Sequence, residues 1–438
     1  MPSPGVRSSR GSAGFQACVP PPSGVSSSHP DTGLEACATP PSGVRSSRLA
    51  ADLPPSGIRE FFDLVSGRAD VISLGVGEPD FATPWKICDE AIDGLRRGYT
   101  SYTSNWGTPE LREALAADLY RRYGLTYDPA CQILVTNGVS EGLDLAMRAL
   151  LDPGDEVIVP EPCFVAYKPA VLLAGGCPVV IGTRVEDGFR LRPEAVEAAL
   201  TPRTRALMIS YPNNPTGAIM SREELLPLAE LAQRHDLVVI SDEIYAYLTY
   251  LGRHTCFASL PGMQERTILL DGFSKAYAMT GWRLGYAAGP EHLLEAMMRI
   301  HSYTAMSAPT MAQIGAVEAL RNGAEDVKHM VGQYDQRRRL LLAGYQRLGL
   351  PCFEPGGAFY TFPSIAHTGL TSAEFSSRLL FEENVAAVPG TAFGACGEGY
   401  LRCTYATHLD LLKEALVRIG RLLERVGGGG TGASAEGV

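Results

Sequence analysis

The stretch that decides the fold is GFSKAYAMTGWRLGY, residues 272–286, where Arg283 follows the lone lysine Lys275 by eight positions. A lysine at its ordinary pKa is a hydrated cation, so it attacks a carbonyl only where a desolvated or cationic site lowers that pKa. Gly272 and Ser274 leave room beside the amine, and the planar guanidinium of Arg283 can hold a phosphate. The segment predicts a pocket for a phosphorylated carbonyl compound. The alternative, surface charges around a glycine-rich bend, is disfavoured by the apolar and aromatic flanks.

This segment resembles the cofactor-lysine signature of the fold-type I, pyridoxal-phosphate-dependent class I/II aminotransferases. The resemblance extends from about Leu53 to about Leu423. It implies that Lys275 bonds the aldehyde carbon of pyridoxal 5'-phosphate and that Arg283 binds the phosphate.

One position departs from the family pattern. Many relatives have a phosphate-binding serine three residues before the lysine, where this chain has Gly272. The phosphate must therefore recruit another hydroxyl, from Ser274 or Ser140.

A carboxylate is expected within LVVISDEIY, residues 237–245. Pyridoxal phosphate is an electron sink only while its ring nitrogen stays protonated, which needs a buried carboxylate. Residues 237–240 predict a buried parallel strand, and Asp242 follows at its carboxyl edge, where open α/β sheets bind ligands. The resemblance implies that Tyr245 hydrogen-bonds the cofactor's phenolic oxygen. The alternative for Asp242 is a helix N-cap, which is weakened by the lysine following in the right order.

Two turns upstream are expected at the same sheet edge. YPNNPTGA, residues 211–218, is dense in turn formers, and Asn214 resembles the family's cofactor-oxygen donor and substrate-binding residue. ILVTNGVSEGLDLAMRAL, residues 133–150, predicts a strand, a glycine turn and a helix that opens at Val139 and Ser140. A helix N-terminus binds anions, so it can hold the phosphate. A plain turn in each place is the alternative.

Four more residues take their roles from the resemblance alone. Phe164 matches the aromatic residue that stacks on the pyridine ring, although it could equally be core. Arg402 matches the arginine that grips the substrate α-carboxylate, and Gly77 matches a residue whose backbone approaches that carboxylate. Tyr102 matches a tyrosine that reaches the phosphate of the neighbouring subunit, which implies a homodimer.

Composition agrees with an enzyme of this kind. The 438 residues suggest two domains with tails, and the net charge of −10 offers no broad basic face for nucleic acid or an anionic membrane. No apolar stretch reaches spanning length, and the ten cysteines lack metal-like spacing. We therefore expect a cytoplasmic protein that binds no metal, nucleic acid or membrane.

The expected fold is α/β, the fold type I of these transferases. Residues 95–301 should form a large cofactor-binding domain with a mixed, mostly parallel seven-stranded sheet flanked by helices. Residues 53–94 and 302–425 should form a smaller α/β domain. Residues 1–52, with repeats of the PPSGVRSSR type, predict a disordered extension, a mis-chosen start or a targeting segment, and residues 426–438 a mobile tail.

The expected activity is ping-pong transfer of an α-amino group to a 2-oxo acid such as 2-oxoglutarate. Dicarboxylate-preferring relatives often carry a lysine where this chain has Ser140, so aromatic or broad neutral L-amino acids are favoured as donors. Aspartate aminotransferase is the alternative. A pyridoxal-phosphate lyase on the same scaffold is a further alternative, as is a ligand-sensing regulator, which the short, Pro/Gly-rich N-terminus disfavours.

Overall fold

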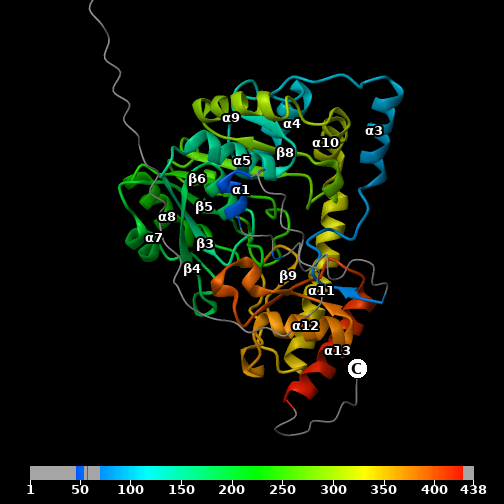
Figure 1. Ribbon diagram of the computed structural model, residues 1–438. Helices are drawn as coiled ribbons and strands as arrows, with labels where there is room; N and C mark the ends of the chain where they lie inside the picture. The colour runs from blue at the N-terminus through cyan, green and yellow to red at the C-terminus, as the bar shows by residue number, and fades with distance from the viewer. Residues whose placement is uncertain (1–45, 54–56, 58–69, 428–438) are drawn as a thin grey trace, which may run out of the picture. The chain divides into compact units, whose positions relative to one another are not determined.

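The computed structural model of the protein describes residues 46–53, 57 and 70–427 (Figure 1). The chain divides into two compact units, residues 1–48 and 49–438. A short helix, α1 (Arg48–Asp52), buries none of its residues. The rest of the predicted extension up to residue 45, and residues 428–438 of the predicted tail, lie outside the described residues. The division into five segments made from the sequence stays a prediction.

A seven-stranded sheet with the order β2-β8-β7-β6-β5-β3-β4 carries the lysine segment. Its strands are β2 (Ile133–Thr136), β3 (Glu156–Glu161), β4 (Cys177–Gly182), β5 (Thr204–Ile209), β6 (Val238–Asp242), β7 (Thr267–Gly272) and β8 (Gly285–Ala288). Strand β8 is antiparallel to both neighbours, whereas the other adjacent pairs are parallel. The mixed, mostly parallel sheet expected from the sequence is confirmed.

Helices cover both faces of this sheet, which is why its central strands are apolar along their length. Helices α5 (Val139–Leu150), α6 (Tyr167–Leu173) and α9 (Glu291–Thr304) pack with Met208 and Ile240. Helices α7 (Pro193–Ala199) and α8 (Arg222–Arg234) pack with Leu207 and Val239, which are the alternate positions of the same strands. Helix α4 (Pro109–Tyr123) covers that second face at β2. Figure 1 shows the strands between these helices.

The remaining helices and strands come from residues 72–96 and 310–427. The helices are α3 (Trp85–Arg96), α10 (Thr310–Asn322), α11 (Ala324–Arg347), α12 (Ser372–Glu383) and α13 (Leu409–Gly427). The short strands are β1 (Ile72–Ser73), β9 (Tyr360–Thr361), β10 (Val385–Ala386), β11 (Val388–Pro389) and β12 (Leu401–Thr404). Figure 1 shows α11 running from α10 toward α12 and α13.

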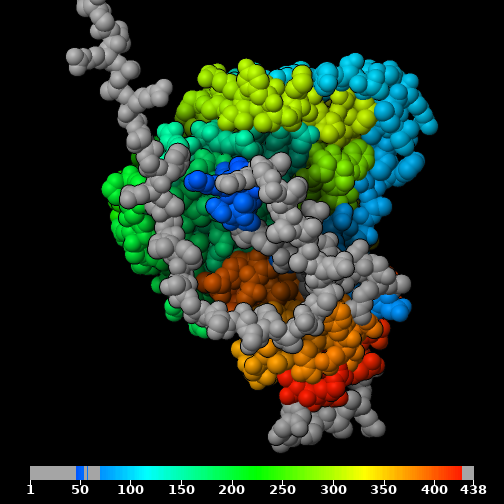
Figure 2. Space-filling view, viewed as in Figure 1, coloured from blue at the N-terminus to red at the C-terminus, as the bar shows by residue number. Residues whose placement is uncertain are grey.

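Backbone pairing ties the early residues to the late ones. Strand β1 pairs in parallel with β10, so Ile72 lies opposite Val385. In Figure 2 the small blue patch at the right edge, which belongs to this early segment, lies beside the orange and red C-terminal residues. A second sheet, β11-β12-β9, brings Arg402 beside Tyr360. None of the described helices combines the length and the apolar character that a membrane span requires.

Candidate active site

Ten of the eleven site residues expected from the sequence line one cavity of about 280 Å³. They are Gly77, Val139, Ser140, Phe164, Asn214, Asp242, Tyr245, Lys275, Arg283 and Arg402. They come from the carboxyl ends of β6 and β7, the start of α5, the strand β12 and the connecting loops. This is the place where open α/β sheets bind ligands, because the strand ends and helix N-termini meet there.

Lys275 follows β7 and reaches across the cavity. Its Nζ atom donates a hydrogen bond to the backbone oxygen of Gly77 over 2.6 Å. Burial lowers the pKa of Lys275 to about 8, an effect that the positive charges of Arg402 and Arg283 reinforce and the carboxylate of Glu78 opposes. An amine with this pKa is partly neutral near pH 7 and can act as a nucleophile or a base.

Asp242 ends β6 and is buried. Its Oδ1 atom accepts from the backbone nitrogen of Ile244 over 3.2 Å, and its Oδ2 atom accepts from the Tyr167 hydroxyl over 2.7 Å. Burial raises the pKa of Asp242 to about 6, and the Tyr167 hydrogen bond lowers it. Residues 244–247 form turns and no helix follows Asp242, so the alternative that Asp242 is a helix N-cap is wrong.

The start of α5 and Arg283 form a cradle with the right charge for a phosphate. Gly138 precedes the helix with φ of 79°, and a Cβ atom there would lie 2.7 Å from Nη2 of Arg283. The guanidinium therefore lies against the helix N-terminus, whose unpaired backbone N–H groups also favour an anion. The residues present fit the phosphate of pyridoxal phosphate.

The glycine at position 272, where many relatives have serine, is explained by close packing. A Cβ atom at this position would lie 2.9 Å from the oxygen of Leu284 and 3.0 Å from Cα of Gly285, because β7 and β8 pair there. A serine would not fit without a shift of the backbone. Both hydroxyl residues named in its place, Ser140 and Ser274, line the cavity.

Arg402 is buried with no carboxylate partner among the described side chains. Its guanidinium donates to Oδ1 of Asn214 over 3.1 Å and to the oxygen of Gly75 over 2.5 Å, and Nε is buried without a hydrogen bond. Burial lowers the pKa of Arg402. A buried cation with an unused donor is a site for a carboxylate, because a bound anion restores the charge balance.

Asn214 and Gly77 are constrained by the same guanidinium. The Asn214 amide turns its oxygen toward Arg402, which leaves its NH2 group as the remaining donor. A Cβ atom at Gly77 would lie 2.4 Å from the Tyr360 hydroxyl and 3.7 Å from Nη1 of Arg402. Only glycine fits there, as expected for a backbone that approaches a ligand closely.

Tyr102 does not line this cavity. Its side chain is 81% exposed, and Tyr303 is 92% exposed. Large exposed aromatic side chains are frequent at interfaces between proteins. The transfer of Tyr102 to a neighbouring site stays a prediction.

Sequence reasoning assigned no site role to several residues that line the cavity, among them Tyr167 and Tyr360. Tyr167 begins α6 three positions after Phe164, and the two rings meet edge to face with centroids 5.7 Å apart. Tyr360 begins β9 after the segment GGAF. The hydrogen bonds that link these two tyrosines to the site are made with residues far away in the sequence. The only local signal for either is therefore an aromatic residue at the end of a turn.

The fold and the fit of these residues define an enzyme of fold type I that depends on pyridoxal phosphate. The family model described as aminotransferase class I and II matches residues 69–419, and the chain belongs to this family. Its fold class and cofactor are therefore as expected from the sequence.

Individual relatives agree with this assignment. The putative aminotransferase YugH of Bacillus subtilis is 52% identical over 373 residues, which are 85% of this chain and 97% of the relative. The aromatic-amino-acid aminotransferase 2 of Thermococcus litoralis is 46% identical, over 84% of this chain and 96% of the relative. The solved aspartate aminotransferase of Thermus thermophilus with maleate is 40% identical with a TM-score of 0.83, over 87% of this chain and 100% of that one.

Proposed function

We propose that this aminotransferase takes the α-amino group from aromatic or broad neutral L-amino acids and passes it to a 2-oxo acid such as 2-oxoglutarate, by a ping-pong mechanism. The observation that carries the proposal is the charge of the cavity wall. Among the described residues the cations that line it are Lys275, Arg283 and Arg402. Each has a role in holding the cofactor or an α-carboxylate, and the donor side chain meets apolar walls such as Leu143 and Ile244.

The cofactor-holding roles are assigned to the cavity residues as follows. Arg283, Ser140 and the backbone of Val139 would bind the phosphate, and Phe164 would cover the ring. Asp242 would pair with the ring nitrogen, and Tyr245 and Asn214 with the phenolic oxygen. The bound cofactor supplies an electron sink for negative charge at the substrate Cα.

The chain's own residues then do three things. Arg402 orients the α-carboxylate, since a planar guanidinium grips two oxygens at once. The amine of Lys275, which burial keeps partly neutral, removes and returns the proton at Cα. The negative charge of Asp242 stabilises the protonated, cationic form of the cofactor ring.

Aspartate aminotransferase is the second candidate, because an aspartate aminotransferase of Pyrococcus abyssi is also 46% identical to this chain. A homodimer with Tyr102 shared between sites and a cytoplasmic location are further parts of the proposal.

The test is a panel of phenylalanine, tyrosine, leucine and aspartate as donors, each with 2-oxoglutarate. We expect the aromatic donors to give the highest kcat/KM. A preference for aspartate of about tenfold or more would replace the proposal by the second candidate. Release of ammonia and an oxo acid without an acceptor would identify a lyase.

Lys275→Ala tests the mechanism. The variant should bind pyridoxal phosphate but lose amino transfer by orders of magnitude, because a combined tether and base is removed. Lys328→Ala is the matched control, since Lys328 is 79% exposed and, among the described residues, forms an ion pair with Glu325 alone, at 3.8 Å. Turnover of Lys275→Ala close to that of the control would contradict the assignment.

A further inference from the structure

Tyr360 lies beneath the guanidinium of Arg402. In the antiparallel pair of β9 and β12, Tyr360 lies opposite Thr404, which places its side chain on the same face as Arg402 two residues away. Cζ of Arg402 lies 4.5 Å from the centroid of the Tyr360 ring and 4.7 Å from that of Phe393. Both rings therefore lie within cation–π distance of the guanidinium.

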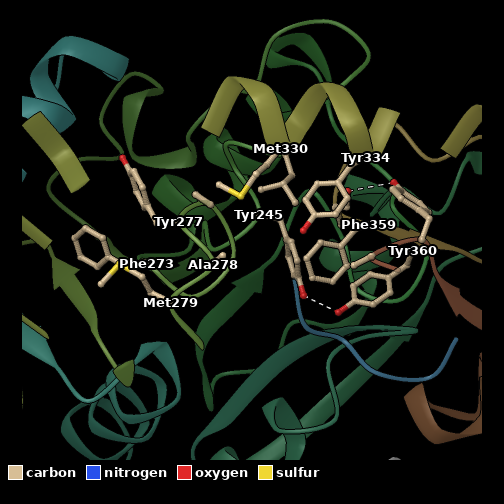
Figure 3. Packing of buried hydrophobic residues seen from close by; sticks show 14 of the residues in the cluster. Tyr245, Phe273, Tyr277, Ala278, Met279, Met330, Tyr334, Phe359 and Tyr360 are labelled. Atoms are coloured by element: carbon tan, nitrogen blue, oxygen red, sulfur yellow. Dashed lines mark hydrogen bonds between the residues drawn. The ribbon is translucent and has the colours of Figure 1, made fainter. Parts of the chain in front are cut away.

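The hydroxyl of Tyr360 points to Tyr245. The two oxygen atoms are 2.8 Å apart, and both side chains are buried (Figure 3). Figure 3 also shows Phe359 beside this pair; its ring meets that of Tyr245 edge to face, with centroids 5.4 Å apart. The packing leaves neither ring free to turn away.

A count of protons sets the direction of this hydrogen bond. Each tyrosine hydroxyl donates one proton. If the Tyr245 hydroxyl donates to the cofactor's phenolic oxygen, as the proposed function requires, then Tyr360 must be the donor to Tyr245. A donor on its oxygen makes Tyr245 a stronger donor in turn, because hydrogen bonds in series polarise one another.

We propose that Tyr360 is a positioning residue that serves both halves of the site: its ring fixes Arg402 for the substrate carboxylate, and its hydroxyl directs the Tyr245 proton toward the cofactor. This inference rests on the proposed function. The two roles reside in different atoms, so substitutions can separate them. Within the part of the chain that the structure describes, the charged or titratable groups around the tyrosine pair are Arg402, Asp242, Lys275 and Tyr334.

The first test is Tyr360→Phe, which keeps the ring and removes the donor. We expect the KM for the amino donor to stay within about twofold, since the stacking on Arg402 survives. The midpoint of the pH titration of the bound cofactor's visible absorbance should move up by about 0.5 to 1 pH unit. The reason is that Tyr245 becomes a weaker hydrogen-bond donor to the negative phenolic oxygen, so more negative charge remains on the cofactor and a proton is held more tightly. In a Tyr245→Phe background the same substitution should cause no further shift.

The second test is Tyr360→Leu, which also removes the ring. The KM for the amino donor should rise roughly 3- to 30-fold beyond that of Tyr360→Phe, as expected for a lost cation–π contact. Tyr345→Phe is the matched control: its buried hydroxyl lies 3.1 Å from Oγ1 of Thr361, the next residue of β9, and outside the cavity. It should change neither the KM nor the titration midpoint.

The outcomes separate the two proposals. Wild-type protein that shows no visible absorbance with the cofactor, or no amino transfer, would defeat the proposed function. Wild-type protein that does both, with a Tyr360→Phe titration identical to that of Tyr345→Phe, would overturn the role of the hydroxyl. If Tyr360→Leu does not fold, the Tyr360→Phe titration and the double variant still decide that role.

Discussion

Replacing Tyr167 by phenylalanine should extend the pH dependence of this protein's unfolding free energy to pH values above the Asp242 pKa of about 6. The Tyr167 hydroxyl lies 2.7 Å from Oδ2 of Asp242 and 2.9 Å from the Ser210 hydroxyl. Burial raises the pKa of Asp242 from 3.8 to about 6 despite this hydrogen bond, which acts to lower it. Without the hydroxyl we expect the pKa of Asp242 to rise further.

The size of the change follows from the strength of such a bond. A hydrogen bond to a charged group contributes about 1.5–3 kcal/mol, which corresponds to about one to two pKa units. The pKa of Asp242 in the variant would then be about 7 to 8. A carboxyl group whose folded-state pKa lies above its unfolded value binds its proton more tightly in the folded state. Its contribution to stability therefore falls as pH rises through that interval.

In the wild-type protein the loss of the Asp242 contribution to the unfolding free energy ends near pH 6, the pKa of Asp242. In the variant it should continue to higher pH, so that the extra loss of unfolding free energy grows to about 1.5–3 kcal/mol by about pH 8.5. Urea unfolding of the cofactor-free protein, variant beside wild type, at about pH 5 and about pH 8.5 measures this difference. The variant should also bind pyridoxal phosphate more weakly at neutral pH, because Asp242 is then partly uncharged.

Tyr211→Phe is the control for this experiment. The buried Tyr211 hydroxyl donates to the backbone oxygen of Phe189 over 3.0 Å, and no carboxylate of the described residues is its hydrogen-bond partner. Its loss should cost the same free energy at both pH values. A difference between Tyr167→Phe and wild type that is equal at both pH values would refute the coupling of Tyr167 to Asp242.

Two more outcomes depend on the other charges of the cavity. The rate at which cofactor-free protein captures pyridoxal phosphate, followed by absorbance, should rise about tenfold per pH unit and level off near the Lys275 pKa of about 8; a rate still rising at about pH 10 would mean an ordinary lysine. Arg402→Lys should raise the KM of every donor roughly 10- to 100-fold, because one ammonium cannot replace a guanidinium that contacts both Asn214 and Gly75. Unchanged donor KM values in steady-state assays would count against Arg402.

The sequence was informative wherever a chemical group directly follows a strand or precedes a helix. Asp242 ends β6, Lys275 lies three residues beyond β7 and Ser140 lies in the first turn of α5. Such residues are brought to one sheet edge by the parallel topology itself, so a correct strand order is enough to gather them. The roles assigned to them stay predictions, whereas their placement in one cavity is a property of the fold.

Tyr167 and Tyr360 could not be found in this way. Tyr167 meets Asp242 across 75 positions, and Tyr360 meets Tyr245 across 115 positions. Nothing in the local pattern distinguishes either from a core tyrosine, because their role depends on which hydroxyl or carboxylate the tertiary packing places opposite them. Hydroxyl groups that hydrogen-bond a site residue from a distant part of the chain can therefore be identified only from the structure.

Gly272 shows a third situation, in which the sequence revealed a difference from relatives but not its cause. The missing serine suggested a phosphate site that lacks one hydroxyl. In the structure Gly272, the last residue of β7, pairs with Gly285, the first residue of β8, and a Cβ atom at Gly285 would lie 2.6 Å from the backbone nitrogen of Val139. Both glycines thus allow the start of α5 to approach the strand ends closely, next to Arg283. A serine at 272 would push these elements apart, so the close approach of the helix N-terminus and the guanidinium, rather than a hydroxyl at this position, is what the chain offers a phosphate.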